Sequence, residues 1–225
     1  MSLPKVVYIM GPPGAGKGTQ AMMLAESIGY HQFSTGAAMR ELAHQDTELG
    51  REVKNLIDNG ILASPELAAR IVTSAIEEYI NEGTGLIFDG TPRTVAEAEI
   101  IERFFEEKGY GRPTVMVLNV EKEDMIERNS KRLYCLDVTP DFPIIHPEDE
   151  DRCKTLGGVV ARRPDDDPAK MGTRWEQFMK HTWPVIQKYR ERGWVHEIDG
   201  KHAIEQVHGD VMRAIEELKH DPSQN

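Results

Sequence analysis

The chain has 225 residues, of which 39% are hydrophobic, and it carries a formal net charge of -11 at pH 7. This length and apolar content suffice for a globular core, whereas the acidic balance argues against a surface that binds nucleic acid or another polyanion. An anionic substrate would need a local cluster of cations, so we expect some of the arginines to converge.

The sequence also bears on location and partners. No apolar run approaches the ~18 residues of a transmembrane helix, and residues 1–5 lead into a strand without the apolar region of a signal peptide. We therefore expect a cytoplasmic protein without membrane or nucleic-acid partners. We also expect it to act as a monomer. Cys135 and Cys153 are too few for a disulfide scaffold, and we expect ordinary thiols in a reducing compartment.

The first elements are an apolar strand at 6–10, a glycine-rich turn at 11–19 (GPPGAGKGT) and a helical pattern at 20–28. Such a turn leaves backbone N–H groups unpaired at the positive end of a helix, which suits phosphate, and Lys17 adds a cation. The pattern matches the P-loop form except that Gly18 replaces Ser or Thr and the hydroxyl follows at Thr19. The alternative is a glycine turn that binds nothing, but strand, loop, lysine and helix stand in the required order.

Short helical segments come next. An extended segment at 31–36 precedes a helical run at 37–43, with Ser34 or Thr35 as its N-cap. A second run at 49–59 has apolar residues on one face, and a third helix begins at Ser64 and Pro65. We expect these short helices to form an insertion rather than part of the sheet.

The alternation of strand and helix then resumes. A strand at 85–90 ends at Asp89, where the carboxyl edge of a parallel sheet would bind ligands, and Arg93 follows at the same edge. Thr94 opens a helix that extends to about residue 108, and a strand at 114–119 and a helix at 122–132 follow. This order predicts an α/β fold with parallel strands and crossover helices.

The stretch from 133 to 160 shows no regular pattern and contains three prolines, two adjacent glycines and an acidic group at 148–151. A long irregular stretch inside a compact enzyme is typical of a lid or binding loop. Helix is expected again at 168–192, followed by a strand at 194–198 and a closing helix at 203–219.

Taken together, the motifs resemble the adenylate kinase family of nucleoside monophosphate kinases, over nearly the whole chain and in the long-lid form of bacterial members. The motifs that carry the resemblance are the loop 11–19, Ser34-Thr35-Gly36 with Arg40, Asp89 to Thr94 (DGTPRT), Arg128, Arg132, Arg163 to Asp166 (RPDD) and Arg174. The displaced hydroxyl after Lys17 is the form that this family uses.

The resemblance implies a P-loop three-layer α/β/α fold with a central parallel sheet, a helical insertion that binds the nucleoside monophosphate (NMP), and a lid. The core would comprise residues 1–33, 64–130 and 167–225, the NMP-binding insertion 34–63, and the lid 131–166. The implied reaction is reversible transfer of the γ-phosphoryl group of ATP to AMP, which gives two ADP and requires Mg²⁺.

The resemblance also assigns roles residue by residue. The donor ATP would contact Gly14, Ala15, Gly16, Lys17, Gly18 and Thr19, with its base near Arg128 and His202. The acceptor would contact Thr35, Arg40, Ala63, Gly90, Arg93, Glu97, Arg163 and Arg174. The catalytic cations would be Lys17, Arg93, Arg132, Arg163 and Arg174, and water molecules on Mg²⁺ would contact Asp89 and Asp166.

Three residues near the acceptor depart from the family pattern, namely Ala37 for Asp, Thr91 for Phe and Glu97 for Gln. A carboxylate at 97 accepts from the adenine amino group but cannot donate to the ring nitrogen unless it is protonated. The alternatives are a shifted acceptor (UMP, CMP or GMP) and a non-catalytic ATP-binding regulatory protein, although Arg40 and Arg93 argue against the latter. By the same resemblance Thr35 favours AMP, because relatives that prefer pyrimidine nucleotides tend to have Ala at this position. Glu97 also suits a purely structural capping box with Thr94.

The resemblance raises the question of zinc, which some long lids bind through paired Cys-x-x-Cys motifs. In this chain Cys135, His146 and Cys153 stand singly, without such a pair. We therefore expect no zinc site.

Overall fold

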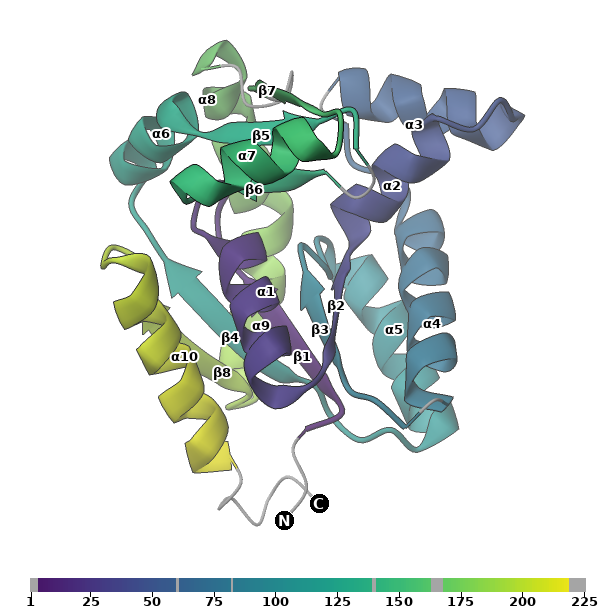
Figure 1. The fold of residues 1–225 in the computed structure, drawn as a ribbon. Coiled ribbons are helices and arrows are strands. Elements are labelled where there is room, and N and C mark those ends of the chain that lie inside the picture. Colours follow the sequence, from purple (N-terminus) through teal and green to yellow (C-terminus); the bar gives the residue numbers. More distant parts are fainter. Residues whose placement is uncertain (1–3, 60, 82, 139–140, 163–167, 219–225) are drawn as a thin grey trace.

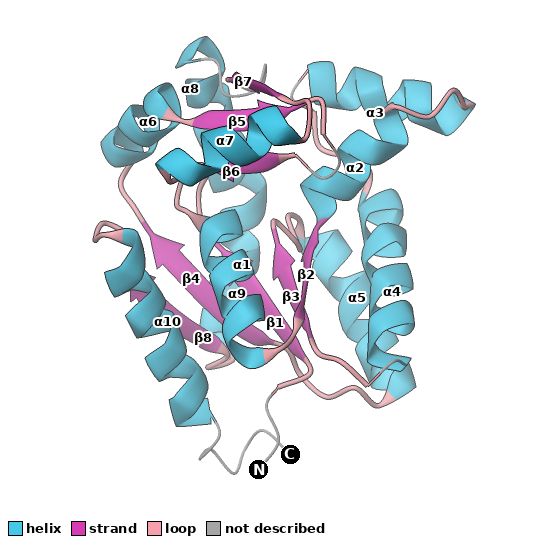
Figure 2. Cartoon of the chain, in the orientation of Figure 1, coloured by secondary structure: helices cyan, strands magenta, loops and turns pink. Residues whose placement is uncertain are grey.

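The computed structural model describes residues 4–59, 61–81, 83–138, 141–162 and 168–218. Its centre is a five-stranded parallel sheet with the strand order β2-β3-β1-β4-β8 (Figures 1 and 2). The strands are β1 (Val6–Met10), β2 (His31–Ser34), β3 (Leu86–Asp89), β4 (Thr114–Asn119) and β8 (Val195–Asp199). The predicted α/β fold with a central parallel sheet is confirmed.

Helices cover both faces of this sheet, because successive strand residues point to opposite sides and both sets are apolar. Val7 and Ile9 of β1 pack in one core cluster, whereas Val6 and Tyr8 pack in the other. The first cluster includes residues of α1 (Lys17–Ile28) and α10 (Ile204–Leu218), and the second includes residues of α4 (Pro65–Asn81), α5 (Val95–Lys108) and α9 (Trp183–Glu191). The result is the predicted three-layer α/β/α arrangement.

Hydroxyl side chains start the helices that carry site residues. Ser34 accepts a hydrogen bond from the Ala37 N–H at 3.3 Å and begins α2 (Thr35–Ala43). In the same way Ser64 precedes α4 and Thr94 precedes α5. These predicted N-caps are confirmed, and α3 (Glu48–Asp58) matches the second predicted run to within one residue at each end. Gly60, which follows that run and suits the end of a helix, lies outside the described residues.

The stretch after α6 (Lys122–Lys131) is regular, so the prediction of an irregular loop was wrong. It forms an antiparallel sheet with the order β6-β5-β7, from β5 (Leu133–Leu136), β6 (Phe142–Ile144) and β7 (Val159–Ala161), with α7 (Pro147–Thr155) packed on it. These strands are too short to show a period of two, and α7 is too polar to show an apolar stripe. Figure 1 shows this unit, hereafter the β5–β7 unit, beyond the carboxyl ends of the five parallel strands and beside α2.

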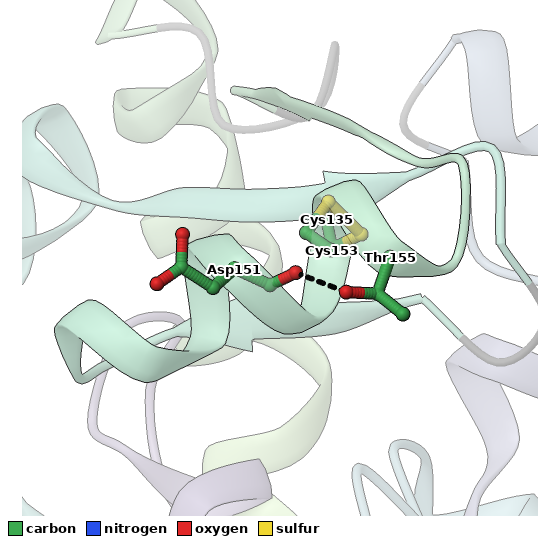
Figure 3. The surroundings of a disulfide bond; sticks show 4 residues. All are labelled: Cys135, Asp151, Cys153 and Thr155. Atoms are coloured by element: carbon green, nitrogen blue, oxygen red, sulfur yellow. Dashed lines mark hydrogen bonds between the residues drawn. A yellow bond between two sulfur atoms is a disulfide. The ribbon is translucent and has the colours of Figure 1, made fainter.

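A disulfide bond joins Cys135 of β5 to Cys153 of α7 (Figure 3), so the prediction of two ordinary thiols was also wrong. Within α7, all of whose residues are described, Cys153 is the single buried side chain. Cys135 is fully buried as well. The disulfide thus supplies the inward contact of a helix that otherwise presents charged residues. Both sulfur atoms that the sequence offered to zinc are bonded to each other.

We expect the Cys135→Ala/Cys153→Ala variant to loosen the β5–β7 unit by about 3 kcal/mol, because the crosslink closes a loop of 18 residues and anchors α7. Hydrogen exchange of residues 133–161 should become faster, whereas that of the core strand β4 should stay unchanged. Equal exchange in both proteins, with the disulfide verified by mass spectrometry in the parent chain, would contradict this expectation.

The predicted helix at 168–192 is present but has an insertion. It comprises α8 (Pro168–Gln177), a π-helical turn at Phe178–Thr182, and α9. Such turns are frequent at functional sites, and this one brings Phe178 and Thr182 to a cavity. In the part of the chain that the structure describes, no helix combines the length and the apolar character needed to cross a bilayer.

Candidate active site

The glycine-rich turn lies between β1 and α1. Gly14 and Gly16 have φ angles of 75° and 89°, which glycine adopts without strain. Gly16 is the N-cap of α1 and no side chain caps this helix, so the first N–H groups of α1 are available to an anion. A Cβ at Gly14 would collide with the side-chain amide of Asn129. Glycine at this position therefore lets the turn approach α6 closely.

Lys17 extends from this turn, and its Nζ donates a hydrogen bond to the Pro12 carbonyl at 2.8 Å. Burial lowers the pKa of Lys17 to about 8, against the attraction of Asp89, and the positive charges of Arg93, Arg174 and Arg132 lower it further. A cation in such a positive environment gains stability when an anion binds beside it.

A cavity of about 300 Å³ lies in front of Lys17. Its walls come from the glycine-rich turn, α2, the segment after α3, the loop after β3, β5 and the π-helical turn. The cations that line it are Lys17, Arg40, Arg93, Arg132 and Arg174. The structure thus brings together, in a chain with a net charge of -11, cations from widely separated parts of the sequence. This arrangement suits a ligand with several phosphate groups.

The loop after β3 holds Arg93 through several hydrogen bonds. Its Nε donates to the Gly90 carbonyl at 2.7 Å, its backbone N–H donates to Glu97 Oε2 at 2.8 Å, and its carbonyl accepts from Thr182 Oγ1 at 3.1 Å. The side chain is open to the cavity, but the surrounding walls displace water and lower the pKa of Arg93. The Nε hydrogen bond orients the guanidinium, and the two backbone hydrogen bonds hold the loop that carries it.

Glu97 is buried, with 2% of its surface exposed, and its two carboxylate oxygens accept from the Thr91 hydroxyl and the Arg93 N–H. Burial raises the pKa of Glu97, and these two hydrogen bonds oppose that shift. Its own N–H donates to Thr94 Oγ1 at 3.1 Å, as in the predicted capping box, and a backbone hydrogen bond from Thr94 also opposes the rise of its pKa. Glu97 therefore supports the loop and also lines the cavity.

Two buried polar atoms on the α2 side have no hydrogen-bond partner among the described residues, namely Thr35 Oγ1 and Arg40 Nε. Both residues line the cavity. Such atoms are costly unless a ligand or water satisfies them, so they indicate where a polar ligand group would bind. The apolar wall beside them consists of Met39, Leu56, Ile57, Ile61, Leu62, Ala63 and Ala68.

Most of the predicted site residues face this one cavity. It is lined by Gly14, Gly16, Lys17, Gly18, Thr35, Arg40, Ala63, Asp89, Gly90, Arg93, Glu97, Arg132 and Arg174. Ala15 and Thr19 are buried behind the turn and do not line it. Arg163 and Asp166 lie outside the described residues.

Arg128 and His202 lie away from this cavity but close to each other in the fold. The Arg128 guanidinium donates to the carbonyls of Gly200 and Lys201 at 2.6 and 3.0 Å, and so joins α6 to the loop after β8. His202 Nε2 lies 3.5 Å from Asp199 Oδ2. The two segments that the resemblance places near the ATP base therefore lie side by side.

Sequence reasoning missed several residues of the site. Tyr134 lines the cavity beneath Arg132, whose guanidinium lies 4.6 Å from the centroid of the ring. Asp141 pairs with Arg40 from a stretch that had been interpreted as irregular. Thr182 approaches Arg93 because of the π-helical turn. None of these three residues had a sequence signal. The apolar wall did have one, because the apolar face of α3 predicted that Leu56 and Ile57 point inward.

Comparisons with known proteins agree with this geometry. The family model "Adenylate kinase" matches residues 9–194. The chain is similar to the adenylate kinase of Bacillus licheniformis, with 36% identity over 93% of this chain and 97% of that protein. It is also similar to those of Archaeoglobus fulgidus (33% identity, 95% and 99%) and Bacillus subtilis (35% identity, 95% and 99%). With these matches over nearly the whole length, and with a cation-lined cavity in front of a P-loop, the chain belongs to the adenylate kinase family.

Proposed function

We propose that the protein catalyses reversible transfer of the γ-phosphoryl group of ATP to AMP, which gives two ADP. Membership of the family makes it a phosphotransferase whose acceptor is a phosphate group. The observation that carries the proposal is the set of five cations, Lys17, Arg40, Arg93, Arg132 and Arg174, which line one cavity in front of the uncapped N-terminus of α1. A protein that bound ATP alone would not require cations on the α2 side.

The donor would lie along the glycine-rich turn. Backbone N–H groups at Gly14 to Thr19 would hold its phosphates, and Lys17 would contact the β- and γ-phosphates. Its adenine would lie near Arg128 and His202, since the hydrogen bonds of Arg128 to the loop after β8 form a surface there.

The acceptor would lie between α2 and the loop after β3. Its phosphate would bind Arg40 and Arg93. Arg40 Nε has no hydrogen-bond partner among the described residues, so it could donate to an oxygen of that phosphate. Thr35, whose hydroxyl also lacks a partner within the described ranges, would contact the nucleoside together with Ala63, Gly90 and Glu97. The apolar wall of α2 and α3 suits a base and a ribose.

Transfer between two bound phosphates needs no nucleophilic side chain, because the acceptor oxygen belongs to the substrate. The protein has to align the two phosphates and neutralise charge in the transition state. Lys17, Arg132 and Arg174 would neutralise the transferring group, with Arg163 as a further candidate from outside the described residues. Closure of the β5–β7 unit over the cavity would exclude water, which otherwise competes as acceptor.

Asp89 fits a role beside Mg²⁺. It ends β3, and a Cβ at Gly18 would lie 3.0 Å from its Oδ2, so its carboxylate faces the start of α1. Oxygen donors, often through water, are what Mg²⁺ prefers. Asp89 would hold water molecules of the ion, and Asp166 remains a candidate from outside the described residues. When bound, Mg²⁺ would neutralise charge on the phosphate oxygens.

The proposal includes the predicted organisation, with a core at 1–33, 64–130 and 167–225, an NMP-binding insertion at 34–63 and a lid at 131–166. It also includes action as a monomer in the cytoplasm. The disulfide does not support that location, since disulfides are rare in cytosolic proteins. Fractionation of the producing cells and size-exclusion chromatography test both statements.

A coupled assay of ADP formation tests the function. ATP is supplied with AMP, GMP, UMP or CMP in turn, and the fastest turnover is expected with AMP. A faster rate with another nucleotide would reassign the acceptor. No ADP with any of the four would favour a regulatory ATP-binding protein instead.

An altered acceptor is the second candidate, and one observation favours it. In its ionised form Glu97 only accepts hydrogen bonds, whereas the family's Gln both accepts and donates. The four-nucleotide comparison therefore also tests whether the buried carboxylate changes the base that the site prefers.

The lowered pKa of Lys17 predicts that the enzymatic activity depends on pH. Since the folded pKa is about 8, kcat/KM for ATP should fall about tenfold per pH unit above that value, as the free enzyme loses the cation. kcat should fall only at higher pH, because bound phosphates stabilise the charge. The Lys17→Arg variant, whatever its absolute rate, should not show this decline in kcat/KM, because a guanidinium stays charged.

The lowered pKa of Lys17 also makes the free energy of unfolding depend on pH. Between pH 8 and 10.5 the unfolded chain binds more protons at Lys17 than the folded protein does. The contribution of Lys17 to the free energy of unfolding of the ligand-free protein should therefore rise with pH across this window. Lys17→Met should remove that rise, and an equal pH-dependence in the variant would assign it to another group.

A further inference from the structure

Two segments 101 residues apart meet at the mouth of the cavity. Arg40 of α2 and Asp141, which precedes β6, form an ion pair of 3.2 Å between Nη2 and Oδ1. Only 28% of the Arg40 side chain and 14% of the Asp141 side chain are exposed. The Lys154–Asp151 pair on the surface is much more exposed, with 68% and 81% of the two side chains accessible to water. The Arg40–Asp141 pair is therefore less screened by water than an ordinary surface pair.

The same guanidinium also faces the site proposed for the acceptor phosphate. A Cβ at Gly36 would lie 3.5 Å from Arg40 Nη1 and 3.8 Å from Arg93 Nη2, so both arginines converge at the start of α2. The remaining donor, Arg40 Nε, is buried without a partner among the described residues. Arg40 thus has one nitrogen engaged by Asp141 while another is directed to the phosphate site.

The guanidinium is planar and rigid, so a hydrogen bond at one nitrogen restricts the direction of the other two. The Asp141 carboxylate also offsets part of the repulsion between Arg40 and Arg93, which face each other across Gly36. Both effects prepare two neighbouring cations for one shared phosphate, and both depend on the β5–β7 unit lying against α2.

We propose that Asp141 is a positioning residue that couples closure of the β5–β7 unit to the orientation of Arg40 in the acceptor site. When the unit closes, Asp141 anchors it to α2 and orients Arg40 at the same time; when the unit opens, Arg40 loses that restraint. This inference rests on the proposed function for the identity of the acceptor, but the anchoring itself can be measured without turnover.

The first measurement is hydrogen exchange of the ligand-free protein. Asp141→Asn keeps the size and one acceptor oxygen but removes the charge. Exchange of the β5–β7 unit and of α2 should increase together, by about fivefold to tenfold, whereas β4 should not change. Asp151→Asn is the matched control, since Asp151 is an exposed acid of the same unit that pairs with Lys154. Unchanged exchange in both segments of Asp141→Asn would overturn the anchoring.

The second measurement separates KM from kcat. Asp141→Asn should raise KM for AMP about fivefold to tenfold and leave KM for ATP unchanged, because the effect passes through Arg40. In an Arg40→Ala background the same substitution should have no further effect on KM for AMP. A lower KM for AMP would show that Asp141 competes with the phosphate, and an undiminished effect without Arg40 would show that it acts elsewhere; either result overturns the proposal.

The two measurements also keep this inference apart from the proposed function. If the parent protein forms no ADP with any nucleotide, the proposed function fails while the exchange result still decides whether Asp141 anchors the unit. If the parent protein is active and Asp141→Asn changes neither exchange nor KM for AMP, the positioning role fails alone.

Discussion

Replacement of Lys17 by Met is expected to lower kcat about 10²- to 10³-fold, which corresponds to about 3–4 kcal/mol of transition-state stabilisation. Lys17 is the cation of the glycine-rich turn, and its positive surroundings of Arg93, Arg132 and Arg174 are those of a site that awaits several phosphates. Methionine keeps the length of the side chain but cannot follow the charge on the transferring group. Steady-state ADP formation from saturating ATP and AMP measures the effect.

The control is Lys131→Met, because Lys131 is 74% exposed and forms a local i,i+4 pair with Glu127. Its rate should equal that of the parent protein. If Lys17→Met kept a rate within about threefold of the parent protein, the loop would bind phosphate without taking part in transfer, and the catalytic role of Lys17 would be lost.

Replacement of Arg93 by Ala is expected to lower kcat/KM for AMP about 10²- to 10³-fold, mostly through a higher KM. Arg93 is anchored by hydrogen bonds to Gly90, Glu97 and Thr182, and the bond to the Gly90 carbonyl is made by the guanidinium Nε itself. Loss of the guanidinium removes one of the two cations that converge on Gly36 and leaves Glu97 without its nearest positive charge. Initial rates at varied AMP and saturating ATP measure the loss.

Arg103→Ala serves as the matched control, because Arg103 is an exposed arginine of α5 whose Nε donates to its own helix at Glu99. Circular dichroism has to show that Arg93→Ala stays folded. An unchanged KM for AMP in a folded Arg93→Ala protein would mean that the acceptor phosphate binds elsewhere.

Local sequence patterns were sufficient where one segment determines its own structure. Continuous apolar runs within 6–10 and 114–119 predicted strands. Ser34, Ser64 and Thr94 predicted where helices begin, because capping needs only neighbours three residues away. The glycine-rich turn was recognisable for the same reason, since its backbone conformation and its lysine are encoded in nine consecutive residues.

The β5–β7 unit could not be predicted in this way. Strands of three or four residues have no measurable period, and α7 has a single buried residue, so neither carries a hydrophobic pattern. Its structure depends on pairing between distant strands and on the bond between Cys135 and Cys153. Two cysteines 18 residues apart are compatible with thiols, with metal ligands or with a disulfide, and only their spatial proximity decides among these.

The sequence alone determined the α/β fold, the phosphate-binding turn and the family that the motifs resemble, because each rests on short, contiguous patterns. It also implied that cations must gather somewhere in an acidic chain. The resemblance had already named the five cations of the site, and the tertiary structure places them around one cavity. Only the tertiary structure decided that Glu97 supports the loop of Arg93 and that Asp141 reaches Arg40 across 101 residues. Such contacts arise from the packing of separate elements, and the physical reason that they escape prediction is that no local pattern encodes which distant side chains will meet.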